Sequence, residues 1–159
     1  MKKLLALILT IFFMTSMVGA KTTYSYDKYG SKTGSYRSTS LGYNSYDKYG
    51  SKTGSYMKTS SGYYAYDKYG AKTGSYRKTS TGYNSYDKYG TKTGSYKKTS
   101  SGYNSYDKYG RKTGSYKTNS NGSVTQYDKY GKKVGTYKTN SSGKTTYYDS
   151  KGSKVRSYK

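Results

Sequence analysis

Large hydrophobic side chains follow one pattern before residue 21 and another after it. Leu4–Met14 is an almost unbroken apolar run, preceded by Lys2 and Lys3 and followed by the small residues 18–20. A basic start, an apolar run and small residues in this order are typical of a secretory signal peptide. The run is shorter than the roughly 20 residues that a bilayer-spanning helix needs. We therefore expect a signal-peptide helix over residues 1–20, cleaved near Ala20, and no membrane span after its removal.

From residue 21 onward the recurring large side chain is tyrosine, and it returns with a fixed period. Asp-Lys-Tyr-Gly begins at Asp27, Asp47, Asp67, Asp87, Asp107 and Asp128, and the related Asp-Ser-Lys-Gly begins at Asp149. The first four intervals are 20 residues and the last two are 21. Such a period indicates tandem copies of one supersecondary unit. We expect one tandem repeat domain over residues 21–159, built from seven Tyr-Asp-x-x-Gly units.

Residues 44–63 serve as the type unit. Asp47 and Gly50 stand at the first and fourth places of a four-residue turn, where Asp bonds the backbone ahead and Gly takes a positive φ. Residues 59–62 give a second, weaker turn signal. The segments between them are rich in Tyr, Thr and Ser, as strands of about five residues are, and the frequent glycines argue against a helix. The chain therefore predicts an all-β fold, either a repetitive β-hairpin array or a β-solenoid or meander.

The facing of the tyrosines is ambiguous because they do not alternate strictly. Tyr49 is expected in the turn. If Tyr46 and Tyr56 face the same way, successive units would stack them as ladders that replace a core. The two ladders would be Tyr26, Tyr46, Tyr66, Tyr86, Tyr106 and Tyr36, Tyr56, Tyr76, Tyr96, Tyr116.

The last two units each gain one residue between a Gly and the Tyr-Asp pair. A one-residue shift within a strand would reverse its facing, so we expect the extra residue in a turn or a bulge. Val124, Val134 and Val155 are new in these units and predict a better packed C-terminal end.

Composition limits how such a domain can be stabilised. Beyond residue 20 the aliphatic side chains larger than Ala are Leu41, Met57 and the three valines, so the 27 tyrosines must supply nearly all apolar area. The whole chain has a net charge of +23, or +21 without Lys2 and Lys3. Few aliphatic residues with a high net charge are also typical of disorder, which stays the alternative.

The chain has few groups for catalysis. It contains no His, Cys or Glu, and each of its seven Asp occupies the same place in its own unit. Catalysis and metal binding both need several suitable groups converging on one site. We therefore expect no enzyme activity, no cofactor and no metal, with the aspartates acting as turn residues. Without cysteine there is neither a disulfide nor a lipid-acceptor residue, so a secreted, periplasmic or cell-surface protein is expected.

Interleaved cations and tyrosines are the remaining functional signal. Lysines can pair with phosphate, sulfate or carboxylate while a ring stacks on a sugar or base. The candidate polyanion-binding residues are Lys28, Tyr29, Lys32, Tyr36, Lys48, Tyr49, Lys52, Tyr56, Lys68, Tyr69, Lys72, Tyr76, Lys88, Tyr89, Lys92, Tyr96, Lys108, Tyr109, Lys112 and Tyr116. The expected partners are anionic polysaccharide, envelope polymer or extracellular nucleic acid without sequence specificity.

Three functional hypotheses follow. The first is a secreted repeat protein that binds anionic polymers of the cell envelope or extracellular matrix multivalently. The second is a self-associating structural or adhesive matrix protein, and the third is a disordered cationic secreted protein. An alternative without any ligand is that the lysines serve only to keep a Tyr-rich sheet soluble.

Residues 145–155, Thr-Thr-Tyr-Tyr-Asp-Ser-Lys-Gly-Ser-Lys-Val, together with residues 131–134, resemble the YD repeat of RHS-type bacterial surface and toxin-shell proteins. The likeness extends over residues 22–159 and implies a β-hairpin fold with no inherited active site. The apolar residue usual soon after the Gly is replaced by Lys32, Lys52, Lys72, Lys92 and Lys112 in the first five units.

Residues 46–56 also resemble choline- or glucan-binding cell-wall repeats, in which aromatic residues precede an Asp-x-x-Gly turn. Those modules hold choline in Trp-rich cages. This chain has no Trp, and its Lys28-type positions would repel a quaternary cation, which argues against choline.

Overall fold

The computed structural model describes residues 22–159, and the expected signal peptide lies outside these residues. The described chain consists of fourteen antiparallel strands, two for each unit. No helix in this part of the chain is long and apolar enough to cross a membrane. The strands are β1 (Thr22–Asp27), β2 (Lys32–Thr39), β3 (Gly42–Asp47), β4 (Lys52–Thr59), β5 (Gly62–Asp67), β6 (Lys72–Thr79), β7 (Gly82–Asp87), β8 (Lys92–Thr99), β9 (Gly102–Asp107), β10 (Lys112–Thr118), β11 (Val124–Asp128), β12 (Lys133–Thr139), β13 (Thr145–Asp149) and β14 (Lys154–Tyr158).

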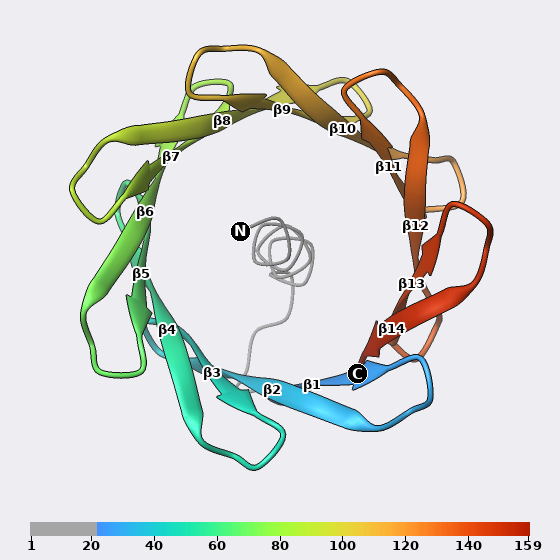
Figure 1. Cartoon of the computed structure of the whole chain (residues 1–159), viewed down its shortest axis with the longest axis horizontal. Coiled ribbons are helices and arrows are strands. Elements are labelled where there is room, and N and C mark those ends of the chain that lie inside the picture. Colours follow the sequence, from blue (N-terminus) through green and yellow to red (C-terminus); the bar gives the residue numbers. More distant parts are fainter. Residues whose placement is uncertain (1–21) are drawn as a thin grey trace.

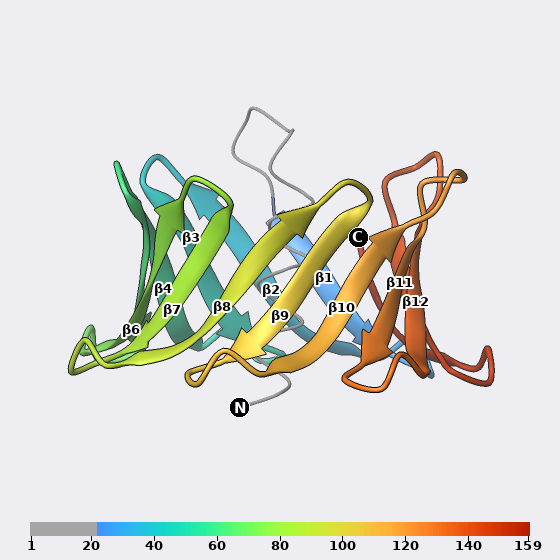
Figure 2. The same ribbon diagram turned by 90° about the horizontal axis from the view of Figure 1, so that it is seen from above.

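Each strand pairs with the strands before and after it in the sequence, and β1 pairs with β14 to close a barrel (Figure 1). The closing seam pairs Ser25 with Tyr158 and Asp27 with Arg156. Seen from the side, the strands are tilted and the hairpins splay outward at one rim (Figure 2). The predicted all-β array of hairpins is confirmed, in the form of an up-and-down meander.

The Asp-x-x-Gly segments form the turns that the sequence predicts. In the type unit, Asp47 Oδ1 accepts hydrogen bonds from the backbone N–H groups of Tyr49 and Ser51, both at 2.9 Å. Gly50 has a φ of 91° and donates its N–H to the Asp47 carbonyl at 3.2 Å. The Asp therefore organises the turn, and Tyr49 lies in it as expected, 81% exposed.

The second turn differs between early and late units. In the early units it is a tight turn that leads into a strand beginning with Gly, such as Gly62 at φ 149°. In the last two units it lengthens to residues 119–123 and 140–144, so the extra residue lies in the turn, as predicted. Asn140 Oδ1 there accepts the Lys144 N–H at 2.9 Å, as Asp does in the other turns.

A β-bulge in each Asp-turn hairpin decides which tyrosines share a face. Ser45 pairs with Gly54 but Tyr46 pairs with Lys52, so Thr53 is an extra residue. As a result Tyr56 pairs with Tyr43 and lies on the same face as Ser45, opposite to Tyr46. A common facing of Tyr46 and Tyr56 is therefore wrong, and the two ladders occupy opposite faces of the sheet.

The inner face carries the ring of tyrosines that replaces a core. The register places Tyr36 opposite Ser45 and Tyr56 opposite Tyr43, so both tyrosines lie on one face of the sheet. Burial raises the pKa of both phenols, as expected for side chains on the concave face. The second predicted ladder therefore exists and is extended by the later units. This inner ring is made by one tyrosine from each even-numbered strand: Tyr36, Tyr56, Tyr76, Tyr96, Tyr116, Tyr137 and Tyr158.

Close packing is tightest in the C-terminal units. Tyr116, Val124, Tyr137 and Tyr147 form a buried hydrophobic cluster, with the Tyr137 and Tyr147 ring centroids 4.5 Å apart. Val124 thus has the role predicted for the late valines. Val134 and Val155, however, are 37% and 39% exposed, because they occupy the bulge positions of their hairpins.

Candidate anion-binding rim

All seven Asp turns lie at one end of the barrel, because each joins an odd-numbered strand to the next even-numbered one. We call this end the Asp-turn rim. The turns and their flanking residues place sixteen cationic side chains there against seven Asp. These cations are Lys28, Lys32, Lys48, Lys52, Lys68, Lys72, Lys88, Lys92, Lys108, Arg111, Lys112, Lys129, Lys132, Lys133, Lys151 and Lys154.

Six of the turns carry the same exposed pair of a lysine and a tyrosine. In the type unit the Lys48 Nζ lies 4.7 Å from the centre of the Tyr49 ring. The equivalent distances in the other five turns are 4.6 to 4.8 Å. The six rings are 70 to 83% exposed. Each pair therefore presents a cation and an exposed ring to solvent, with a spacing that is nearly the same in all six turns. The pairs are Lys28–Tyr29, Lys48–Tyr49, Lys68–Tyr69, Lys88–Tyr89, Lys108–Tyr109 and Lys129–Tyr130.

The aspartates of this rim are directed to their own turns. Each Oδ1 accepts two backbone N–H groups, as described for Asp47. The fifth turn adds an ion pair of 2.7 Å between Arg111 Nε and Asp107 Oδ2. Desolvation alone would raise the pKa of Asp107, but hydrogen bonds from Arg111 and Tyr109 and the Arg111 charge lower it overall. The carboxylates are thus engaged by their own turn backbones, whereas the lysines of the same turns are exposed.

The structure brings together only part of the predicted set. The Lys28- and Tyr29-type residues share the turns. The Lys32-type residues begin the following strands on the outer face, where Lys32 lies 4.8 Å from the Tyr24 ring and Lys72 lies 4.4 Å from the Tyr64 ring. The Tyr36-type residues, by contrast, belong to the inner ring and do not join this surface: Tyr36, Tyr56, Tyr76, Tyr96 and Tyr116.

Burial gives the inner tyrosines a different chemistry. Desolvation raises the pKa of Tyr76 to about 12, with a smaller contribution from Tyr56. Desolvation and Tyr147 likewise raise the pKa of Tyr116 to about 12, although the Arg156 charge opposes the rise. These phenols are neutral over a wide pH range and contribute to the barrel interior.

Sequence reasoning missed a second group of cations on the outer wall. Arg37 lies 4.8 Å from the Tyr46 ring, and Arg77 lies at the same distance from the Tyr86 ring. Lys97 and Tyr106 repeat this arrangement at 5.3 Å. The signal was a cation that follows six of the seven inner tyrosines, with Met57 after Tyr56 as the exception. The aromatic partner of each cation could be found only from the strand register.

Comparisons with known proteins identify no family. No protein-family model matches the chain, and no curated protein matches it. Among solved structures, it is similar to an alternansucrase in complex with isomaltononaose, with 18% sequence identity and a TM-score of 0.22. That match covers 77% of this chain but 10% of the alternansucrase, so this chain spans about a tenth of that protein. Its TM-score is too low to support a shared fold or function.

Proposed function

We propose that this chain is a secreted, non-enzymatic repeat protein that binds anionic polymers of the cell envelope or extracellular matrix. The observation that carries the proposal is the repetition of an exposed lysine–tyrosine pair in six turns of one rim. Each lysine can approach an acidic group while the neighbouring ring contacts a sugar or base. The relationship to YD repeats is part of the same proposal and rests on the shared Tyr-Asp-x-x-Gly turn.

Repetition turns weak contacts into useful affinity. An exposed cation–π pair contributes only about 0.5–1 kcal/mol, and a single surface ion pair contributes about as little. A polymer that reaches several turns of one rim binds the later ones intramolecularly, so their contributions accumulate. Because the turns are nearly identical, we expect recognition of charge density without a preferred sequence in nucleic acid.

Self-association by lateral strand pairing is less favoured by this architecture. Such assembly needs an unpaired strand edge, and within residues 22–159 each strand has a neighbour on both sides. The exposed rim tyrosines would have to mediate assembly instead, and they are already paired with lysines.

The test compares two triple variants with the same change of charge. Lys48→Gln/Lys68→Gln/Lys88→Gln alters the Asp-turn rim, whereas Lys58→Gln/Lys78→Gln/Lys98→Gln alters the ends of the same hairpins at the other rim. Retention on heparin, DNA and isolated envelope is measured at about 0.15 M salt, where weak surface charge is screened. We expect the first variant to lose retention and the second to keep most of it. Loss of wild-type retention at this salt concentration, or equal losses in both variants, contradicts the proposal.

A further inference from the structure

Arg156 occupies a position that is glycine in each of the other six units. In those units the glycine pairs with the Asp of the next hairpin, as Gly34 does with Asp47 and Gly54 with Asp67. The register of the seam places Arg156 opposite Asp27 in the same way. A side chain at Gly54 would bring its Cβ within 2.6 Å of the Tyr66 carbonyl oxygen, so the position normally excludes one. Among the seven described units, only the seventh therefore carries a side chain at this position of the repeat.

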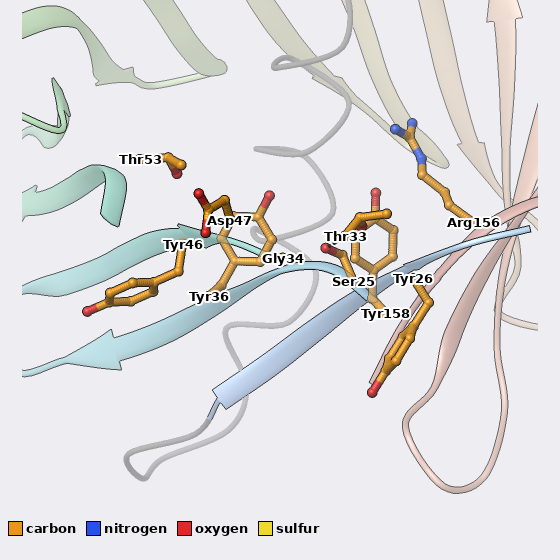
Figure 3. A pocket seen from close by; sticks show the side chains of 10 residues that line it. All are labelled: Ser25, Tyr26, Thr33, Gly34, Tyr36, Tyr46, Asp47, Thr53, Arg156 and Tyr158. Atoms are coloured by element: carbon orange, nitrogen blue, oxygen red, sulfur yellow. Dashed lines mark hydrogen bonds between the residues drawn. The ribbon is translucent and has the colours of Figure 1, made fainter. Parts of the chain in front are cut away.

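The Arg156 side chain lies on the inner face. It belongs to the same face as Tyr147, with which it pairs in register, and its guanidinium carbon is 5.3 Å from the Tyr147 ring centre. In Figure 3, Arg156, Tyr36 and Tyr158 lie on one side of the β1 and β2 ribbons, and Tyr26 lies on the other. Arg156 thus places a permanent positive charge beside the inner ring of tyrosines.

Two buried polar atoms in this region are poorly satisfied. Arg156 Nε and Tyr137 Oη have no hydrogen bond of good geometry, although the Arg156 side chain is close enough to Tyr137 to lower the Tyr137 pKa by hydrogen bonding as well as by its charge. The Arg156 charge acts against the desolvation that raises the pKa of Tyr137, which shows that the two side chains are close. A buried polar atom without a good hydrogen bond is unfavourable, and such atoms commonly mark a site that a water, ligand or ion satisfies.

A cavity of about 340 Å³ adjoins Arg156 at the seam (Figure 3). Its lining residues include Tyr36, Tyr158, Ser25 and Thr33, and the Thr33 hydroxyl donates a hydrogen bond to the Ser25 hydroxyl at 3.0 Å. Asp47 also lines this cavity, and its Oδ1 accepts two N–H groups of its own turn. The volume lies within the range of small-molecule sites.

We propose that this seam cavity binds a monosaccharide-sized hydroxylated acid. Arg156 would hold the single carboxylate of the ligand by charge-assisted hydrogen bonds. The hydroxyl groups would reach Asp47, Ser25 and Thr33, and the ring would contact Tyr36 or Tyr158. Asp47 disfavours a second negative charge at its end of the cavity, which selects an acid with one charged group over a multiply charged anion. This proposal does not depend on polymer binding at the Asp-turn rim.

Isothermal titration of the full chain with D-glucuronate, and separately with D-glucose, tests the assignment at about 0.15 M salt. We expect saturable binding of one glucuronate per chain, and binding of glucose that is at least tenfold weaker. Arg156→Gly restores the residue of the other units and Arg156→Gln keeps the length of the side chain; both should lower glucuronate affinity at least tenfold. Arg37→Ala, on the outer face, should leave it unchanged.

The proposal is overturned by any of three results. One is the absence of saturable glucuronate binding to the wild-type chain. Another is unchanged affinity in an Arg156 variant whose circular dichroism spectrum matches that of the wild type. The third is equal affinity for glucose and glucuronate, since it would remove the role of the charge.

Discussion

The ammonium group of Lys48 lies 4.7 Å above the ring of its neighbour Tyr49, and an Asp turn fixes both residues at the rim of a closed barrel. The turn makes the two side chains adjacent without using either of them to build the fold. That separation of roles is why the same pair can recur around one rim.

Removal of the turn carboxylate should destabilise the barrel. Asp47→Ala deletes the acceptor of two backbone N–H groups, and we expect it to lower the free energy of unfolding by about 1–2 kcal/mol. Asp47→Asn keeps that acceptor, as Asn140 does in a natural turn of this chain, and should cost less than about 0.5 kcal/mol. Urea unfolding followed by circular dichroism measures both. Equal effects of the two substitutions would show that the carboxamide or carboxylate oxygen is not what stabilises the turn.

Glycine is required at the inner position of the hairpin for steric reasons. A Cβ at Gly54 would lie 2.6 Å from the Tyr66 carbonyl oxygen, so Gly54→Ala must push two strands apart. Overpacking of this kind costs about 1–3 kcal/mol. Gly50→Asn is the control, because that position has a positive φ but open space around it, and Asn tolerates such a conformation. In thermal unfolding, the melting temperature of Gly54→Ala should be well below that of Gly50→Asn. The reverse order would contradict the close approach of the strands at Gly54.

The buried phenols predict a loss of stability at high pH. The pKa values of Tyr76 and Tyr116 are raised to about 12 in the folded chain, above the usual value of 10.0. Unfolding therefore releases protons once the pH passes the unfolded pKa, so stability is fully present below about pH 10 and falls progressively towards pH 12. Unfolding in urea at several pH values between 8 and 12 should show this decline.

Substitution of one ring tyrosine provides the matching control. Tyr116→Phe removes one phenol with a raised pKa and should make the decline less steep, although the lost hydroxyl changes stability at neutral pH as well. A pH dependence identical to that of the wild type would mean that Tyr116 does not titrate as a buried group.

Much of the hairpin architecture could be predicted from the sequence, because it depends on local chemistry. Asp47 and Gly50 specify a turn whatever surrounds them, and the 20-residue period fixes where each turn falls. The extra residue of the late units had to lie in a turn, since a shift within a strand would have moved every side chain to the other face.

The facing of the tyrosines and the closure of the barrel could not be predicted in the same way. Without the bulge at Thr53, strict alternation from the Tyr46–Lys52 pair would place Tyr56 on the face of Tyr46, whereas the bulge moves it to the inner face. Closure depends on the pairing of Ser25 with Tyr158, two residues separated by nearly the whole array. The replacement of a repeated glycine by Arg156 is visible in the sequence, but its location inside the barrel follows from the bulge and the closure and could not be predicted.

The central claim is that anionic polymers bind at the Asp-turn rim, and lysine footprinting of the wild-type chain tests it most directly. Acylation of each lysine is measured by mass spectrometry with and without saturating heparin at about 0.15 M salt. We expect heparin to protect Lys28, Lys48, Lys68, Lys88, Lys108 and Lys129 at least threefold, while Lys58, Lys78 and Lys98 at the other rim stay reactive. Protection spread equally over both groups, or confined to the second group, would contradict the account.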